Sequence, residues 1–423
     1  MKQTFINKEL KESCAFYQHK SGVKIYVAEK PEYSSAYAIF GTRYGSIDTA
    51  FKRREQQEFI TVPEGIAHFL EHNLFESEDG DAFSRYAKTG AMANAYTSFD
   101  RTCYLFSCSS NFEESFRILL DFVQNPYFTE ATVQKEQGII GQEINMYDDS
   151  APWRLLFNLL NALYHNHPVK IDIAGTRESI AKINADLLYS CYNTFYNLNN
   201  MFICVAGNVK AEDVFKIADE LLRNTEPVYI DRARVDEPEQ IVKSKVEMNL
   251  PVATPMFAIG YKETCESPTR TIKERVCTDV ILKVLFGSAS PLYKKLFDAA
   301  LINDSFSAEY FYGHGYSSII VEGESQQPEK VYDIINQEIE SVRKNGIDKN
   351  AFESAKKSLY GSCVSVYNSV ENTVMSMVSA AFAEEGIFDY TEYVKDMTYE
   401  DVCCRFENIL KKEFSAISVV KSK

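Results

Sequence analysis

Several features that mark other protein classes are scarce or absent in this sequence. Lysine and arginine number 45 against 60 aspartates and glutamates, so the net charge is −15 and the cationic surface that non-specific nucleic-acid binding needs is not expected. No run of 18 apolar residues occurs, so we expect no membrane span. The patterns GxGxxG and GxxxxGK[ST] are absent, as is GxSxG, which leaves nucleotide binding and serine-hydrolase chemistry without support.

CxxC motifs do not occur, and no leader segment is expected. The ten cysteines are scattered through the chain and none forms CxxC. In a chain of this length, that pattern is typical of reduced thiols rather than of a disulfide framework. The first 20 residues contain no apolar core and no small-residue cleavage site, so no secretory signal is expected. Together these observations predict a cytoplasmic protein.

Length and pattern predict two domains of one kind. A single hydrophobic core rarely extends beyond about 250–300 residues, and this chain has 423. Strand-like and helix-like patterns occur in a similar order in both halves, on either side of a polar stretch that contains prolines. We predict an α+β fold class: domain 1–228, linker 229–245 and domain 246–423, each with an antiparallel-rich sheet flanked by helices and the same topology.

The hydrophobic periodicity places elements within these halves. In the first half it predicts a hairpin at 16–30, strands within 90–109 and at 201–209, and helices at 64–74, 112–124, 130–147, 153–164 and 211–223. In the second half it predicts strands at 255–263, 305–313, 316–325 and 414–420, and helices at 270–286, 328–344, 349–367 and 400–411.

The sharpest chemical signal is an HxxEH motif inside the helix predicted at 64–74. His68 and His72 are four residues apart, so their imidazoles lie on one helix face and can both reach one metal ion. Glu71 flanks the same face, where a carboxylate can accept a proton from the attacking water. The surrounding residues are apolar, and burying such side chains without partners would be costly. Catalytic zinc uses three protein ligands and an open position, so a third ligand must come from elsewhere.

Two glutamates of the helix predicted at 130–147 are candidates for that third ligand. Glu136 and Glu143 are seven residues apart, which is two helical turns, so they share one face. One of them could bind zinc while the other orients the site as a supporting carboxylate. Spacing alone does not assign the two roles, and seen alone both residues would be read as ordinary helix surface.

These residues carry a resemblance to the pitrilysin/insulinase-type family of zinc peptidases, near the mitochondrial processing peptidase branch. GIAHFLEHNLF resembles the metal-binding helix of that family, and KEQGIIGQEI resembles its downstream glutamate segment. Three more segments are similar to family segments: GAMANAYTSFDRTCY, AGTRESIAKI and NMFICVAGNV. The combination is specific, whereas HxxEH alone would not be.

The resemblance implies roles for single residues. His68, His72 and Glu143 would bind one Zn²⁺ per chain, Glu71 would be the general base, and Glu136 would be a supporting catalytic carboxylate. Asn94 and Ala95 fall on the strand at which the family pairs substrate backbone as an added β-strand, a mode that accepts extended peptides of many sequences. The implied assembly is two halves related by a pseudo-twofold, closing as a clamshell when dimeric.

One departure from the family pattern bears on partners. The segment 287–310, where smaller dimeric members carry an active-site Arg and Tyr, contains no arginine; Phe297 takes the Arg position, and the Tyr position falls at 303–306. Either a similar but different partner subunit supplies the pair in a heterodimer, or Tyr310 or Tyr312 substitutes, and a homodimer stays open. The sequence therefore predicts a zinc endopeptidase acting on peptides or unstructured segments, with a non-catalytic peptide-binding or scaffold subunit as the alternative.

Overall fold

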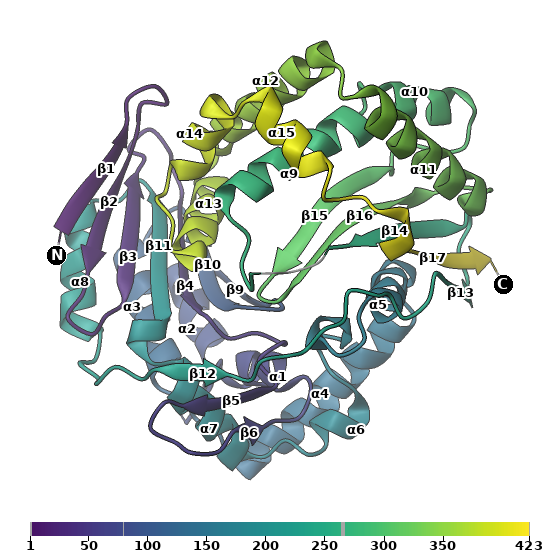
Figure 1. Cartoon of the computed structure of the whole chain (residues 1–423). Coiled ribbons are helices and arrows are strands. Elements are labelled where there is room, and N and C mark those ends of the chain that lie inside the picture. The colour runs from purple at the N-terminus through teal and green to yellow at the C-terminus, as the bar shows by residue number, and fades with distance from the viewer. Residues whose placement is uncertain (1, 79, 264–266, 423) are drawn as a thin grey trace. The chain divides into compact units, whose positions relative to one another are not determined.

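The chain forms two compact units, and the computed structural model describes residues 2–78, 80–263 and 267–422. Unit 1 comprises Met1–Ile144, Asp172–Ala233 and Cys363–Phe388, and unit 2 comprises Asn145–Ile171, Arg234–Ser362 and Asp389–Lys423. Each unit contains one large mixed sheet with helices packed on it (Figure 1). The predicted α+β class is confirmed.

The sheet of unit 1 has seven strands. Their order is β1 (Lys2–Asn7), β2 (Glu12–Gln18), β3 (Lys24–Glu29), β11 (Met201–Gly207), β4 (Ala36–Thr42), β10 (Thr102–Cys108) and β9 (Met92–Thr97). The pair β3–β11 is parallel, and every other neighbouring pair is antiparallel. The hairpin predicted at 16–30 is found as β2 and β3, with Gly22 at φ 93° in the turn between them. The strand β9 lies at one edge of this sheet.

The sheet of unit 2 repeats five of these strands in the same order. Its strands are β13 (Lys245–Leu250), β17 (Ser415–Ser422), β14 (Met256–Lys262), β16 (Tyr316–Glu324) and β15 (Ser307–Gly313). Again the first pair is parallel and the rest are antiparallel. Hence β13–β17–β14–β16–β15 matches β3–β11–β4–β10–β9, and the edge strand β15 is the counterpart of β9. The predicted repeat of topology is therefore confirmed at the level of the sheets.

The helices of the two units are as follows. Unit 1 contains α1 (Ile66–Asn73), α2 (Ala82–Thr89), α3 (Phe112–Gln124), most of α4 (Glu130–Asp148), α6 (Arg177–Ile180), α7 (Ala185–Phe195), α8 (Ala211–Leu221) and α13 (Val370–Ala383). Unit 2 contains α5 (Ala151–Leu163), α9 (Ile272–Phe286), α10 (Pro291–Asp298), α11 (Pro328–Asn345), most of α12 (Lys349–Val366), α14 (Asp389–Asp396) and α15 (Tyr399–Phe406). Short strands form two smaller sheets, β12 (Ile230–Arg232) with β5 (Ala50–Arg53) and β6 (Ile60–Thr61), and β7 (Glu76–Ser77) with β8 (Gly80–Asp81).

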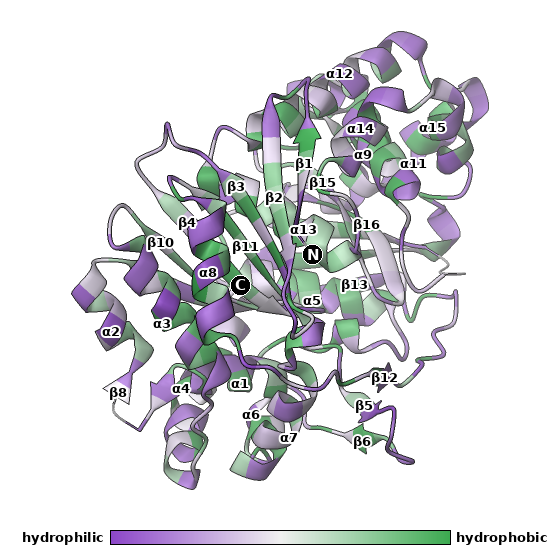
Figure 2. Ribbon diagram, turned by 90° about the vertical axis from the view of Figure 1, so that its left-hand side faces the viewer, coloured by the Kyte–Doolittle hydropathy of each residue, from purple (hydrophilic) through white to green (hydrophobic). Residues whose placement is uncertain are grey.

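The central strands explain why these helices are needed. Every residue of β4 and β11 is buried, so helices must cover both faces of the sheet. On one face, Met377 and Val378 of α13 pack in a cluster with Ile39 and Cys204. On the other, Tyr104 of β10 packs against α3. Figure 2 colours much of β3, β4 and β11 in the green of hydrophobic residues.

Each unit takes one covering helix from the other half of the sequence. α5, which follows α4, packs on β13, β14 and β17 of unit 2, whereas α13, which follows α12, packs on β3, β4 and β11 of unit 1 (Figure 1). Two of the unit boundaries fall within α4 and α12. The predicted domain limits 1–228 and 246–423 stay a prediction. Units 1 and 2 differ from these limits because α5 and α13 each pack in the unit of the other half.

Part of the predicted linker 229–245 has fixed structure. Its beginning includes β12, which pairs with β5 of unit 1. Its centre is attached to unit 2 by Glu237, whose carboxylate accepts the backbone N–H groups of His165, Asn166 and His167 at 2.7–2.9 Å. The Nζ of Lys262 donates to the same carboxylate at 2.6 Å, and the two side chains are only 3% and 9% exposed. The polar composition of this stretch therefore reflects specific pairing as well as exposure.

Two details differ from the sequence-based expectations, and a third observation bears on the expected absence of a membrane span. The strand β1 was not predicted, because most of its residues are exposed and polar. The helix predicted at 400–411 ends at Phe406, and the chain turns at Leu410, which has φ 57°. Finally, the stretch Ile272–Asp298 has the length and composition of a membrane span. However, 56% of its most apolar 18-residue segment is buried inside the structure, as in a helix that packs in a core.

The start of α1 depends on two glycines. Gly65 lies immediately before α1 at φ 84°, and a Cβ added there would lie 2.4 Å from the carbonyl oxygen of Ala174. Gly175, at φ 73°, would place a Cβ 2.6 Å from the carbonyl oxygen of Glu64. The two backbone segments therefore approach so closely that neither position has room for a Cβ atom. This contact sets where α1, which carries the HxxEH motif, enters the unit.

Two glycine-to-alanine substitutions should have opposite effects on stability. We expect Gly65→Ala to lower the free energy of unfolding by about 2 kcal/mol or more, because it adds left-handed strain to a backbone clash. Gly138→Ala, in the middle of α4 with open space around its Cβ, should raise it by about 0.5–1 kcal/mol. Urea unfolding followed by circular dichroism measures both changes. Similar effects of the two substitutions would contradict this account of the α1 entry.

Candidate metal centre

Two helices of unit 1 bring the predicted site residues together. His68 and His72 lie one turn apart on α1, with ring centroids 4.6 Å apart. Glu136 and Glu143 lie two turns apart on α4. The side-chain amide of Asn73, at the end of α1, donates to the carbonyl of Thr132 in the first turn of α4. This contact joins the two helices beside the site.

The ligand atoms of His68, His72 and Glu143 all lie within 4.8 Å of one another. Nε2 of His68 is 3.7 Å from Oε1 of Glu143, and Nε2 of His72 is 3.5 Å from Oε2 of the same carboxylate. Tetrahedral zinc with bonds of 2.0–2.2 Å separates its ligand atoms by about 3.4 Å. The two nitrogens and the carboxylate therefore fit a zinc ion in both chemistry and spacing. Their role as ligands stays a prediction.

The structure also distinguishes the positions of Glu136 and Glu143 relative to His72. Oε2 of Glu136 lies 3.4 Å from Nδ1 of His72, the ring nitrogen that faces away from Glu143. Such a carboxylate fixes the tautomer and orientation of a ligating imidazole, because Nδ1 then carries the proton and Nε2 presents its lone pair. The geometry thus favours Glu143 as the third ligand and Glu136 as its support, a choice that helical spacing left open.

Burial and charge set the protonation of the two imidazoles in the metal-free chain. Burial lowers the pKa of His68 to about 3, so its ring is neutral, which is the form that binds metal. Burial would also lower the pKa of His72, but the hydrogen bond with Glu136 and the negative charges of Glu71 and Glu143 raise it overall. Three carboxylates thus surround two imidazoles, and a cation would offset this negative charge.

Glu71 lies next to this group but outside it. Its side chain is buried, and burial raises the pKa of its carboxyl to about 7, against the lowering effects of His72 and Thr97. Thr97 on β9 donates to Oε2 of Glu71 at 3.0 Å. A carboxyl group with a pKa near neutrality suits proton transfer at physiological pH. The sequence did not single out Thr97, because nothing in its strand pattern shows that β9 packs against α1.

Asn94 and Ala95 lie on β9, which has β10 on one side and forms the edge of the sheet on the other. Asn94 is exposed, and its side-chain oxygen accepts the backbone N–H of Ala95 at 2.9 Å. An edge strand offers backbone groups to which an extended peptide can add. The predicted substrate position is therefore an edge that ends, at Thr97, beside Glu71.

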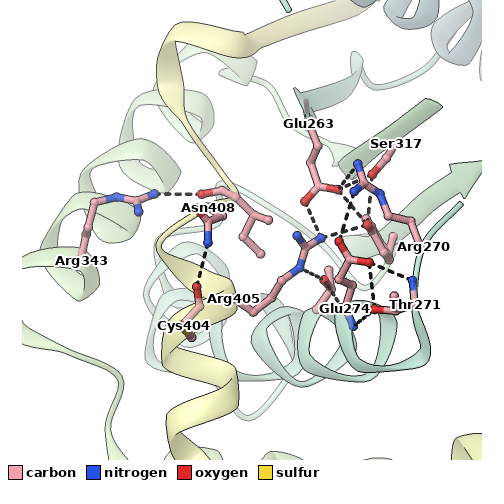
Figure 3. A network of polar contacts seen from close by, with 12 residues as sticks. Glu263, Arg270, Thr271, Glu274, Ser317, Arg343, Cys404, Arg405 and Asn408 are labelled. Carbon is pink, nitrogen blue, oxygen red and sulfur yellow. Dashed lines mark hydrogen bonds and ion pairs between the residues drawn. The ribbon is translucent and has the colours of Figure 1, made fainter. Parts of the chain in front are cut away.

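The residues proposed to replace the family's Arg and Tyr lie in unit 2. The hydroxyl of Tyr310 is buried, donates to Glu263 at 2.7 Å and accepts from Arg405 at 2.9 Å. Figure 3 shows the polar network to which Glu263 and Arg405 belong. Tyr312 is 39% exposed, and its hydroxyl accepts a long hydrogen bond of 3.4 Å from Arg275. Tyr310 is therefore engaged inside unit 2, and Tyr312 is the more accessible of the two.

Known proteins resemble this chain along nearly all of its length. The family model "Insulinase (Peptidase family M16)" matches residues 61–177, and "Peptidase M16 inactive domain" matches residues 182–359. The uncharacterized zinc protease YmfH of Bacillus subtilis (strain 168) is 38% identical over 96% of this chain and 95% of its own length. A probable mitochondrial-processing peptidase subunit beta of Arabidopsis thaliana is 27% identical over 47% of this chain and 39% of its own length.

Solved structures agree with these sequence matches. An M16-like peptidase from Alicyclobacillus acidocaldarius superposes with a TM-score of 0.94 at 34% identity, covering 97% of this chain and 99% of that one. A protease from Helicobacter pylori superposes with a TM-score of 0.82 over 96% of this chain and 99% of its own, and at 19% identity this likeness concerns the fold alone.

Zinc retention distinguishes the two glutamates of α4. We expect Glu143→Gln to abolish stoichiometric zinc, because it removes an anionic ligand, and Glu136→Gln to keep one zinc per chain with about 10- to 100-fold weaker affinity. Glu130→Gln, an exposed change at the start of α4, is the matched control. Elemental analysis and chelator competition measure both quantities. Wild-type zinc affinity in Glu143→Gln would exclude this ligand set.

Proposed function

Because the chain belongs to the insulinase family of peptidases (peptidase family M16), we propose that it is a zinc endopeptidase that hydrolyses peptides or unstructured polypeptide segments. The observation that carries this proposal is the convergence of His68, His72 and Glu143, with the buried carboxyl group of Glu71 beside them. Without a bound cation, this arrangement of carboxylates leaves buried negative charge unneutralised, which is costly. A cluster with a purely structural role would have no reason to accept that cost.

The proposed mechanism assigns one task to each side chain. His68, His72 and Glu143 would hold the zinc ion, and Glu136 would orient His72. When bound, zinc supplies Lewis-acid polarisation of the scissile carbonyl and lowers the pKa of water. Glu71 accepts the proton of the attacking water and then gives it to the departing amine. Its burial keeps this carboxyl basic enough to accept a proton near neutral pH.

The substrate would bind as an additional strand along β9. Asn94 and Ala95 would pair with its backbone, after the side chain of Asn94 releases the N–H of Ala95 that it accepts in the free chain. Such pairing reads main-chain groups, so it favours extended or unfolded segments over folded domains. We propose that selectivity beyond this comes from a closed chamber formed when the protein dimerises as a clamshell of pseudo-twofold-related halves.

A similar partner subunit completes this proposal. The segment 287–310 contains no arginine, and Phe297 at the expected position is an exposed residue of α10. We propose either a heterodimer, in which a similar partner subunit supplies the Arg and Tyr, or a homodimer; one relative is by name a subunit, that of the mitochondrial-processing peptidase. The cytoplasmic location stays a proposal that rests on the cysteine pattern.

A non-catalytic role is the second candidate. The missing arginine favours it, and residues 182–359 match a family model described as an inactive domain. In that case the chain would bind or present a peptide without cleaving it. The intact HxxEH motif and the paired glutamates favour the peptidase.

Replacing one carboxylate distinguishes these candidates. We expect Glu71→Gln to retain one zinc per chain but to lose about 10²- to 10⁴-fold in kcat/KM on a quenched-fluorescence peptide, because the general base is removed. Glu58→Gln, an exposed change in the same unit, is the control. Zinc-loaded wild type that binds but does not cleave, alone or with a similar subunit, would favour the scaffold.

A further inference from the structure

The carboxylate of Glu71 has a single hydrogen-bond donor in the part of the chain that the structure describes. The side chain of Glu71 is buried, and Oγ1 of Thr97 lies 3.0 Å from its Oε2. A buried carboxylate depends strongly on such a donor, since water no longer solvates it. Glutamate also has three rotatable torsions, so a single fixed donor restricts where its oxygens lie.

The proton of the Thr97 hydroxyl is directed to Glu71 by the next threonine. Oγ1 of Thr102 donates to the carbonyl of Tyr44 at 2.8 Å. A hydroxyl has one proton, so Thr102 acts as an acceptor in its 3.5 Å contact with Oγ1 of Thr97. The nearer acceptor of the Thr97 proton is the carboxylate at 3.0 Å. The donor therefore points at Glu71 in a defined direction.

The backbone holds Thr97 firmly. Thr97 and Thr102 are directly opposite each other on the antiparallel strands β9 and β10. Threonine is β-branched, which restricts its first torsion in a strand. Thr97 is also the last residue of β9, the edge strand along which we place the substrate. One side chain thus connects the substrate strand with the proposed base.

We propose that Thr97 is a positioning residue that fixes the Glu71 carboxylate relative to β9. This inference rests on the proposed function only in that Glu71 is the base; the contact itself is independent of catalysis. A fixed carboxylate meets the attacking water without first having to reorient, and a misplacement of about 1 Å can cost about 100-fold in rate. The hydroxyl of Thr97 contacts Glu71 and Thr102, so it acts on the reaction through Glu71.

Two substitutions separate the hydroxyl from the rest of the side chain. Thr97→Val keeps the branched shape and removes the donor, whereas Thr97→Ser keeps the donor. With zinc-loaded protein and a quenched-fluorescence peptide, we expect Thr97→Val to lower kcat about 10- to 100-fold with KM changed less than about 3-fold, and Thr97→Ser to stay within about 3-fold of wild type. Thr61→Val, at an exposed threonine of β6, should change neither value. Equal losses in Thr97→Val and Thr97→Ser, or an unchanged kcat in Thr97→Val, would overturn the proposal.

A second measurement needs no activity and no metal. In metal-free protein, thermal unfolding of Thr97→Val, Glu71→Leu and the double variant forms a double-mutant cycle. We expect Thr97→Val to lower the melting temperature in the wild-type background and to have at most half that effect when residue 71 is leucine. Equal shifts in both backgrounds would overturn the contact. If wild type cleaves nothing while the cycle shows coupling, the proposed function fails and the positioning contact stands.

Discussion

The approach of α4 to α1 at the level of Glu143 is the constraint on which the site depends. His68 and His72 are set by the helix they share, but the carboxylate reaches them only because the two helices are fixed side by side. The close backbone contact of Gly65 with Ala174 sets the entry of α1, and Asn73 joins its end to Thr132. This packing brings a carboxylate and two imidazoles together, at a cost in desolvation that a bound cation would offset.

The two units use similar sheets but treat their buried charges differently. α1 packs against the edge strand β9 in unit 1, as α9 packs against the edge strand β15 in unit 2. Beside β15, the carboxylate of Glu263 is paired with Arg405 and Arg270 and accepts from Tyr310. This network supplies its own cations. Beside β9, the carboxylates face imidazoles instead, and among the residues that the structure describes it is this group of unit 1 that forms a donor set of the kind that zinc prefers.

Local patterns gave much of the fold, and contacts distant in sequence account for the rest. Amphipathic periodicity located α3, α4 and α8, and the spacing of HxxEH placed His68 and His72 on one face. The exchange of α5 and α13 was not predictable, because periodicity shows that a helix has an apolar face but not which sheet covers it. The roles of Glu136 and Glu143 were likewise open from spacing, since both share a face and only the packing of α4 on α1 separates them. Thr97 was not predicted because its contact with Glu71 depends on the packing of β9 against α1, which the strand pattern does not show.

The position of zinc itself tests the central claim most directly. Crystals of the zinc-loaded protein, with diffraction data collected on either side of the zinc absorption edge, would locate the ion from its anomalous signal. The account predicts one strong peak per chain, about 2.0–2.2 Å from Nε2 of His68, Nε2 of His72 and a carboxylate oxygen of Glu143. A peak held by other residues, or by the two imidazoles with Glu143 turned away, would contradict it.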